Sequence, residues 1–208
     1  MQLLILGSGG AQPPPRPGCM CRVCKEARTK GIPYYRTGPS LYLPEQNILF
    51  DTPEEIREQV NREKINHIEH VFLSHWHPDH TMGIRLFEQM NYNFRFRPSY
   101  QSRLYISKET EKNLKNQLLP SYIPLYKRRK IIEIEYITER NGIEIGNLEI
   151  TPYKLPDNDT FLYTFNSALI NNPIRNNNYL VFFQSKDRIV KLGVKNINIS
   201  DTITGILL

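Results

Sequence analysis

Four side chains that can bind a metal ion fall within six consecutive positions of the chain. They are His75, His77, Asp79 and His80. Along an extended segment His75 and His77 point to the same side, and Pro78 then forces a turn that lets the next two ligands face a neighbouring point. Imidazole nitrogen and carboxylate oxygen suit zinc, with manganese and iron left open as alternatives. The stretch therefore predicts a centre for one or two metal ions, which could activate a hydroxide and hold a substrate oxygen.

The elements around this cluster place it at the edge of a sheet. Residues 70–74 (HVFLS) are typical of a buried strand, and the apolar spacing after them predicts a helix over about 80–90 with Met82 and Leu86 on its inner face. A helix over 53–62, capped by Thr52, is predicted to precede the strand. A strand followed by a loop and a helix puts the cluster at the carboxyl end of the strand, where open α/β sheets hold their sites. Chance surface histidines are the alternative, disfavoured because three of the five histidines lie in this cluster.

Cysteines form a second cluster near the N-terminus. All three of the chain lie within six positions, at Cys19, Cys21 and Cys24. Such crowding disfavours disulfides, and three thiolates would serve a structural zinc ion that takes a fourth ligand from elsewhere. Free thiols in a loop are the alternative interpretation.

Length and composition indicate one folded domain over residues 1–208. No apolar run approaches the roughly 20 residues needed to span a bilayer. The apolar start ends at Gly7 and is interpreted as a strand, so we expect a cytoplasmic protein that does not act at a membrane. The formal net charge is +6, and its basic clusters could attract phosphate or nucleic acid, although a solvated basic surface is the simpler interpretation. A homodimer is left open.

The run Leu73–Gly83, with its His-x-His-x-Asp-His pattern, resembles the signature of the metallo-β-lactamase superfamily. The resemblance implies an α/β fold, the αββα sandwich, with the site at one edge. It also implies that His75 and His77 bind one metal ion and that Asp79 and His80 bind the second.

Four further segments, in order, resemble one branch of that superfamily. They are Gly7–Ala11, Cys19–Cys24, Arg36–Ser40 and Phe50–Pro53. The branch contains the cyclic phosphodiesterase of phosphonate breakdown and the pyrroloquinoline quinone biosynthesis protein B. In the phosphodiesterase a similar cysteine trio holds a structural zinc ion, and retention of the full histidine motif favours the hydrolase side of the branch.

The chain departs from the superfamily pattern after the histidine cluster, because no histidine follows His80. The middle ligand would fall near Asp157 and Asp159, either of which could bind a metal ion or simply belong to a turn, and we favour the turn. Asp201 resembles the aspartate that bridges the two metal ions. The fold is therefore expected to be shortened or divergent at the C-terminus.

These features together suggest hydrolysis of a small phosphodiester, including cyclic ones. Asp79 is the candidate catalytic residue, orienting the attacking hydroxide. Arg16 and Arg36 are candidates to bind substrate phosphate, because a guanidinium fork matches it, although surface arginines are an equal alternative. Two rivals stay open: an RNA-processing nuclease, and a non-catalytic metal-binding or interaction protein with an incomplete site.

Overall fold

A computed structural model describes residues 2–92, 99–156, 159–167 and 179–181 of the chain. The strands are β1 (Leu4–Gly7), β2 (Ser40–Leu43), β3 (Ile48–Phe50), β4 (His70–Phe72), β5 (Ser102–Ile106), β6 (Ile132–Tyr136), β7 (Ile143–Ile145), β8 (Leu148–Lys154), β9 (Phe161–Ser167) and β10 (Tyr179–Val181). The helices are α1 (Arg22–Lys30), α2 (Ile56–Arg62), α3 (Pro78–Thr81), α4 (Leu86–Asn91), α5 (Lys108–Asn113) and α6 (Tyr122–Arg128), with short η1 (Pro44–Gln46), η2 (Met82–Arg85) and the π-helical η3 (Leu114–Leu118).

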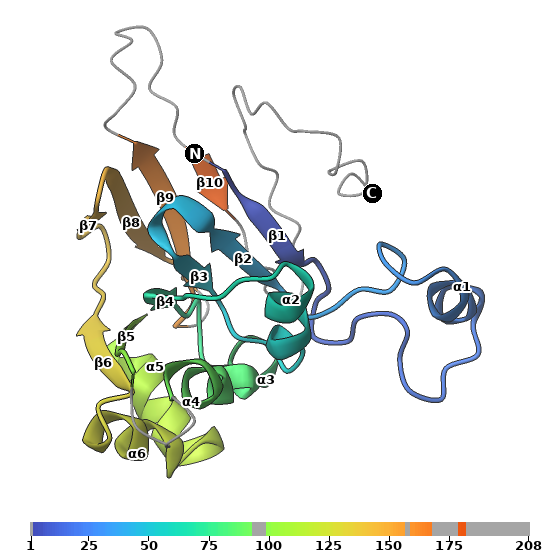
Figure 1. Cartoon of the computed structure of the whole chain (residues 1–208), viewed down its shortest axis with the longest axis horizontal. Coiled ribbons are helices and arrows are strands. Elements are labelled where there is room, and N and C mark those ends of the chain that lie inside the picture. Colours follow the sequence, from blue (N-terminus) through green and yellow to red (C-terminus); the bar gives the residue numbers. More distant parts are fainter. Residues whose placement is uncertain (1, 93–98, 157–158, 168–178, 182–208) are drawn as a thin grey trace, which may run out of the picture.

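Two sheets form the framework (Figure 1). The first has the order β1-β2-β3-β4-β5-β6, and the second has the order β10-β9-β8-β7. In the first sheet β1, β2 and β3 pair antiparallel, whereas β3, β4, β5 and β6 run parallel. The carboxyl ends of β3, β4 and β5 therefore meet at one edge of the sheet, which positions the residues that follow each of them.

Period-2 alternation divides the side chains of the first sheet between two cores. Leu49, Val71 and Leu104 pack on the helix side, with residues of α2, α4 and α6. Phe50 and Phe72, both fully buried, face the second sheet. There the rings of Phe50 and Phe72 stack with centroids 5.1 Å apart. Burying each such ring contributes roughly 2–3 kcal/mol, so the two cores hold the strand ends in fixed positions.

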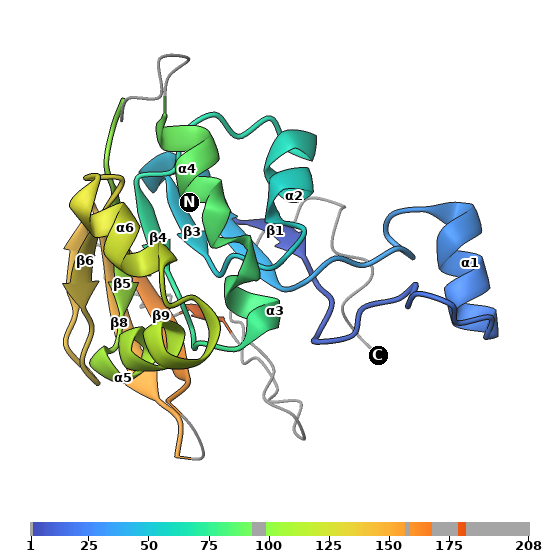
Figure 2. The same cartoon turned by 90° about the horizontal axis from the view of Figure 1, so that it is seen from below.

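The layers agree with the predicted αββα sandwich. Helices cover the outer face of the first sheet, and the second sheet covers its inner face (Figures 1 and 2). Within the described ranges, three of the four layers are therefore present. None of the helices in these ranges is long and apolar enough to cross a membrane.

Two predicted helices differ from those in the structure. The helix predicted over 53–62 begins at Ile56, and Thr52 does not cap it, because Glu55 is the residue before α2 and the Thr52 hydroxyl donates to the carbonyl oxygen of His80 at 3.4 Å. The helix predicted over 80–90 is divided into α3, η2 and α4. That division turns Met82 outward, to 40% exposure, whereas Leu86 stays buried as predicted.

An arm of residues 8–36 leaves the first sheet between β1 and β2. It carries α1, which was not predicted and which projects away from both sheets in both views (Figures 1 and 2). At its base, Gly9 donates its amide hydrogen to the Thr37 carbonyl at 2.8 Å, and Arg36 donates to the Pro14 carbonyl at 2.8 Å. The arm is thus tied to the body mainly at its two ends.

Candidate active site

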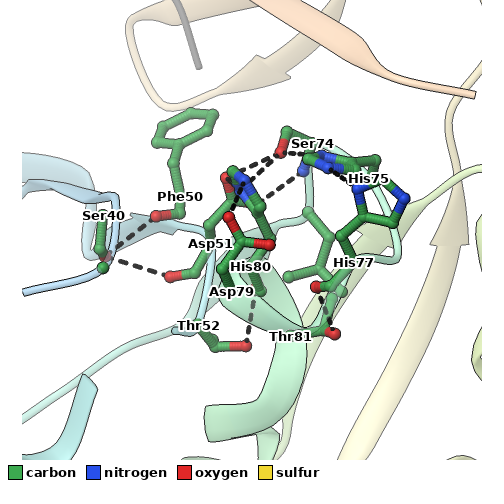
Figure 3. Close-up of polar contacts among 12 residues, drawn as sticks. Ser40, Phe50, Asp51, Thr52, Ser74, His75, His77, Asp79, His80 and Thr81 are labelled. Carbon is green, nitrogen blue, oxygen red and sulfur yellow. Dashed lines mark hydrogen bonds and ion pairs between the residues drawn. The ribbon is translucent and has the colours of Figure 1, made fainter. Parts of the chain in front are cut away.

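The histidine motif begins directly after the buried strand β4, as the sequence predicts. Pro78 occupies the first turn of α3, where its lack of an amide hydrogen costs nothing. The Thr81 hydroxyl donates to the carbonyl oxygens of Trp76 and His77, at 3.0 and 2.9 Å, and closes the turn. The loop after β4 is therefore a compact, internally bonded turn that aims its side chains at one place (Figure 3).

Close packing against the chain after β3 fixes the far side of this turn. The amide of Gly83 donates to the Thr52 carbonyl at 2.9 Å. A Cβ at Gly83 would overlap the carbonyl oxygen of Pro53 and the side chain of Ile56, so the position requires glycine.

The four predicted ligands form two adjacent pairs. The Nε2 atom of His75 lies 3.0 Å from the Nδ1 atom of His77. The Nε2 atom of His80 lies 3.4 Å from the Oδ2 atom of Asp79. The rings of His75 and His80 lie 4.1 Å apart, which joins the pairs into one cluster. His75 and His80 are buried, whereas the Asp79 side chain keeps 23% exposure and can meet solvent or substrate.

Asp51 and Ser74, which the sequence analysis did not select, hold the outer faces of these ligands (Figure 3). Asp51 is fully buried, and its Oδ2 atom lies 2.7 Å from Nδ1 of His80. Its carboxylate also accepts hydrogen bonds from the Ser74 amide at 2.7 Å and the Ser74 hydroxyl at 2.8 Å. The Ser74 hydroxyl oxygen lies 3.0 Å from Nδ1 of His75. His75 and His80 thus each have one ring nitrogen held by the scaffold and the other turned toward a neighbouring ligand.

The position of Asp51 follows from the sheet order. It comes directly after β3, which lies parallel to β4, so it reaches the edge at which the histidine motif begins. Its φ of 59° is the left-handed conformation that aspartate tolerates better than most residues. An acidic residue after a buried strand was the available signal in the sequence, but its meaning depends on which strand lies beside β4.

Burial and charge set the protonation states of the cluster. Burial, aided by the charges of His80 and His77, lowers the pKa of His75 to about 3, so its ring is neutral at pH 7. Burial acts to lower the pKa of His80 as well, but the charge and hydrogen bond of Asp51 outweigh it and raise that pKa to about 9. Burial acts to raise the pKa of Asp79, and the bond to His80 holds it below its usual value. Asp51 and His80 therefore form a buried hydrogen-bonded pair, and a metal ion bound at Nε2 of His80 would replace a proton there.

This donor set fits a divalent ion such as zinc. Tetrahedral zinc with bonds of about 2.0–2.1 Å to nitrogen keeps two ligand atoms about 3.3 Å apart. The two ligand pairs, at 3.0 and 3.4 Å, have this spacing. The contacts from Asp51 and Ser74 to the opposite ring nitrogens are those that orient metal-binding histidines in general.

The later candidate ligands have different outcomes. The carboxylate of Asp159 accepts hydrogen bonds from the hydroxyls of Ser107 and Thr110 and lies 3.3 Å from the Lys154 ammonium, so it ties the loop after β8 to α5, in keeping with the favoured turn interpretation. That loop does approach the centre, since the Phe161 amide donates to the Ser74 carbonyl at 2.8 Å. Asp157 and Asp201 lie outside the described residues, so their roles stay predictions.

The cysteine trio comes together in the arm. The sulfur atoms of Cys19, Cys21 and Cys24 all lie within 4.8 Å of one another, which is the arrangement needed to bind one metal ion. Cys24 is buried, Cys19 is half-buried and Cys21 is exposed, and all three are free of disulfides. Interactions with the backbone and the thiol of Cys21 lower the pKa of Cys19 to about 6. The thiol group of Cys19 is thereby favoured as thiolate, the form that binds metal.

The two predicted phosphate-binding arginines lie in the arm. Arg16 belongs to the cysteine cluster, where one guanidinium nitrogen lies 3.7 Å from Sγ of Cys19. Arg16 also contacts Cys24 and Arg28 of α1, and α1 lies apart from α3 in both views (Figures 1 and 2), so Arg16 lies with the cysteines of the arm. Arg36 is exposed at the base of the arm. Two residues later, Gly38 packs against Pro53, which lies next to the histidine turn. A phosphate-binding role remains a prediction for both.

The fold and the site together define a member of the metallo-β-lactamase superfamily, as the sequence resemblance implied. More narrowly, the family model described as Anti-Pycsar protein Apyc1 matches residues 26–170, more than half of the chain. The chain belongs to this family.

Solved structures support the same fold. A diphosphatase from the PhnP family, known from a crystal structure, is 26% identical in sequence, with a TM-score of 0.60. The match covers 79% of this chain and 61% of the diphosphatase chain. Zinc-bound PqqB from Methylobacterium extorquens is 20% identical in sequence, with a TM-score of 0.63. The match covers 81% of this chain and 60% of the PqqB chain. The chain thus spans about three fifths of the length of both, and the second likeness shows the fold alone.

A curated octanoyltransferase of Porphyromonas gingivalis (strain ATCC BAA-308 / W83) is 34% identical over 87 residues. The match covers 40% of this chain but only 17% of that protein. Because the match covers so small a part of the octanoyltransferase, it gives no reason to expect octanoyltransferase activity in this chain.

Proposed function

We propose that this chain is a metal-dependent hydrolase that cleaves small phosphodiesters, cyclic ones included. The observation that carries the proposal is the paired arrangement of four ligands, with His75 beside His77 and His80 beside Asp79, on a scaffold that fixes their outer faces. The likeness to a PhnP-family diphosphatase supports phosphate chemistry.

The side chains divide the work by position. His75 and His77 would hold one divalent ion, and Asp79 and His80 a second. Such ions supply Lewis-acid stabilisation of charge that develops on phosphoryl oxygens. Asp79 is the acidic residue among the four ligands, and its side chain is 23% exposed. Its carboxylate would accept a hydrogen bond from the attacking water. Arg36, at the exposed base of the arm, is the candidate to bind substrate phosphate.

The test uses the full chain, supplied with zinc or manganese, and a panel of phosphodiesters. The panel contains bis(p-nitrophenyl) phosphate, 2′,3′- and 3′,5′-cyclic nucleotides and a cyclic sugar phosphate. We expect metal-dependent turnover that falls at least about 100-fold in His77→Ala, because a metal ligand is lost. His67→Ala is the matched control, since His67 contacts Tyr100 away from the motif, and it should keep full activity. Undiminished turnover in His77→Ala would remove the motif from the reaction.

A nuclease of the same superfamily is the second candidate, and the charge of the arm favours it. Residues 8–36 contain six basic residues and one acidic residue, which is +5 of the chain's net +6. The basic residues are Arg16, Arg22, Lys25, Arg28, Lys30 and Arg36, and the acidic one is Glu26. RNA cleavage that weakens steeply with salt, without turnover of small diesters, would favour the nuclease. Bound metal without any turnover would favour a non-catalytic protein.

A further inference from the structure

The cysteine loop is closed by an arginine that bonds to its backbone carbonyls. Arg28, on α1, donates one guanidinium hydrogen bond to the Cys19 carbonyl at 2.6 Å and another to the Arg16 carbonyl at 2.7 Å. The Cys19 amide in turn donates to the Arg16 carbonyl at 3.1 Å. One planar guanidinium therefore spans both ends of the turn that presents Cys19.

The helix supplies this contact by its spacing. Cys24 and Arg28 are four residues apart on α1 and share one face of it. Cys21 is the N-cap residue of α1, directly before Arg22. A single nine-residue helix thus carries one sulfur ligand at its start, a second one turn later and the bridging arginine on the following turn.

Arg16 contacts the sulfur atoms directly. Its amide lies 3.4 Å from Sγ of Cys24, and its guanidinium lies 3.7 Å from Sγ of Cys19. Three thiolates around a divalent ion leave one unit of negative charge, which a guanidinium next to the sulfur atoms offsets.

We propose that Arg16 and Arg28 are positioning residues of a cysteine metal site: Arg28 fixes the loop in its binding shape, and Arg16 bonds to the sulfurs and offsets their charge. This assigns Arg16 to the arm rather than to substrate phosphate. The inference does not rest on the proposed phosphodiesterase activity, and its readout is spectroscopic.

The experiment titrates the metal-free full chain with cobalt(II) against a competing chelator. Sulfur-to-cobalt charge-transfer absorption reports the cysteine site alone, because the histidine centre contains no sulfur. We expect this absorption in the wild type and its loss in Cys19→Ser. Arg28→Ala and Arg16→Ala should bind cobalt about 10–100-fold more weakly at this site, the range found for residues that orient metal ligands. Arg22→Ala, the same change on an exposed arginine of the same helix, should bind like the wild type.

Conservative variants keep the result decisive if an alanine variant folds poorly. Arg28→Lys retains the charge but cannot bridge two carbonyls, so its affinity should fall close to that of Arg28→Ala. Arg16→Lys retains the charge beside the sulfurs, so its affinity should lie between those of Arg16→Ala and the wild type. If all four arginine variants bind cobalt as Arg22→Ala does, or if the wild type shows no thiolate–cobalt absorption, the proposal is wrong.

Discussion

The two ligand clusters of this molecule are built in opposite ways. The contacts of the histidine centre join residues far apart in the sequence, such as Asp51 with His80, 29 positions away, and Ser74 with Phe161. The hydrogen bonds of the cysteine loop join residues at most twelve positions apart. The first cluster therefore exists only when the sheet has formed, whereas the second depends on one helix and the turn before it.

Burial follows the same division. Asp51, Ser74 and His80 are 0–2% exposed, so their polar groups must satisfy one another. In the arm, Met20 is 68% exposed and Val23 is 51% exposed. A change at the histidine scaffold should disturb the whole fold, and a change in the arm should stay local.

The largest effect is expected for Asp51→Ala. The substitution leaves the buried His80 ring and the Ser74 amide without their partner, and removing one member of a buried ion pair costs about 3–5 kcal/mol. Urea denaturation should show that loss in the free energy of unfolding. Glu54→Ala, which removes an exposed acid one turn before α2, should change it by less than about 0.5 kcal/mol. Equal stability of the two variants would show that the scaffold is not what holds the histidine turn.

A smaller effect is expected from adding one methyl group in each region. Gly83→Ala forces a Cβ against the Pro53 carbonyl and should lower the free energy of unfolding by about 1–3 kcal/mol. Gly31→Ala, at the end of α1, meets no atom within 4 Å but strains a backbone with φ of 67° and ψ of −156°, at a cost of about 1–3 kcal/mol confined to the arm. Denaturation midpoints compare the two. A larger loss of global stability in Gly31→Ala would contradict the division of the molecule into a cooperative body and a local arm.

The same division explains which features the sequence predicts. The histidine motif and the cysteine trio are local patterns, and the structure brings the three cysteines together and the four residues of the motif into two pairs. The strand before the motif follows from a short apolar run. The superfamily, and with it the sandwich of two sheets, follows from the motif, and the structure confirms it.

Features that depend on tertiary pairing escape prediction. Asp51 becomes a partner of His80 only because β3 lies parallel to β4, which the spacing of residues along the chain does not reveal. For the same reason Thr52 resembles a helix cap in sequence but bonds to the His80 carbonyl. The seven-residue α6 contains Pro124 and was not predicted, because packing of Ile123 and Tyr126 into the core outweighs its weak helical pattern.

The smallest effect on global stability is expected from emptying the cysteine site. Cys24→Ser removes one sulfur ligand, yet the base of the arm bonds to the body through Gly9 and Thr37, far along the chain from the cysteines, so the denaturation midpoint of the body should barely move. The arm itself should loosen, because its only buried apolar side chains are Cys24 and Ala27. Limited trypsin digestion measures this, since Arg22 and Lys25 lie exposed on α1. We expect zinc to slow cleavage in the arm of the wild type and to leave cleavage in Cys24→Ser unchanged. If Cys24→Ser instead lowered the midpoint of the whole chain as Asp51→Ala does, the arm would be part of the cooperative core, and the contrast between the two clusters would fail.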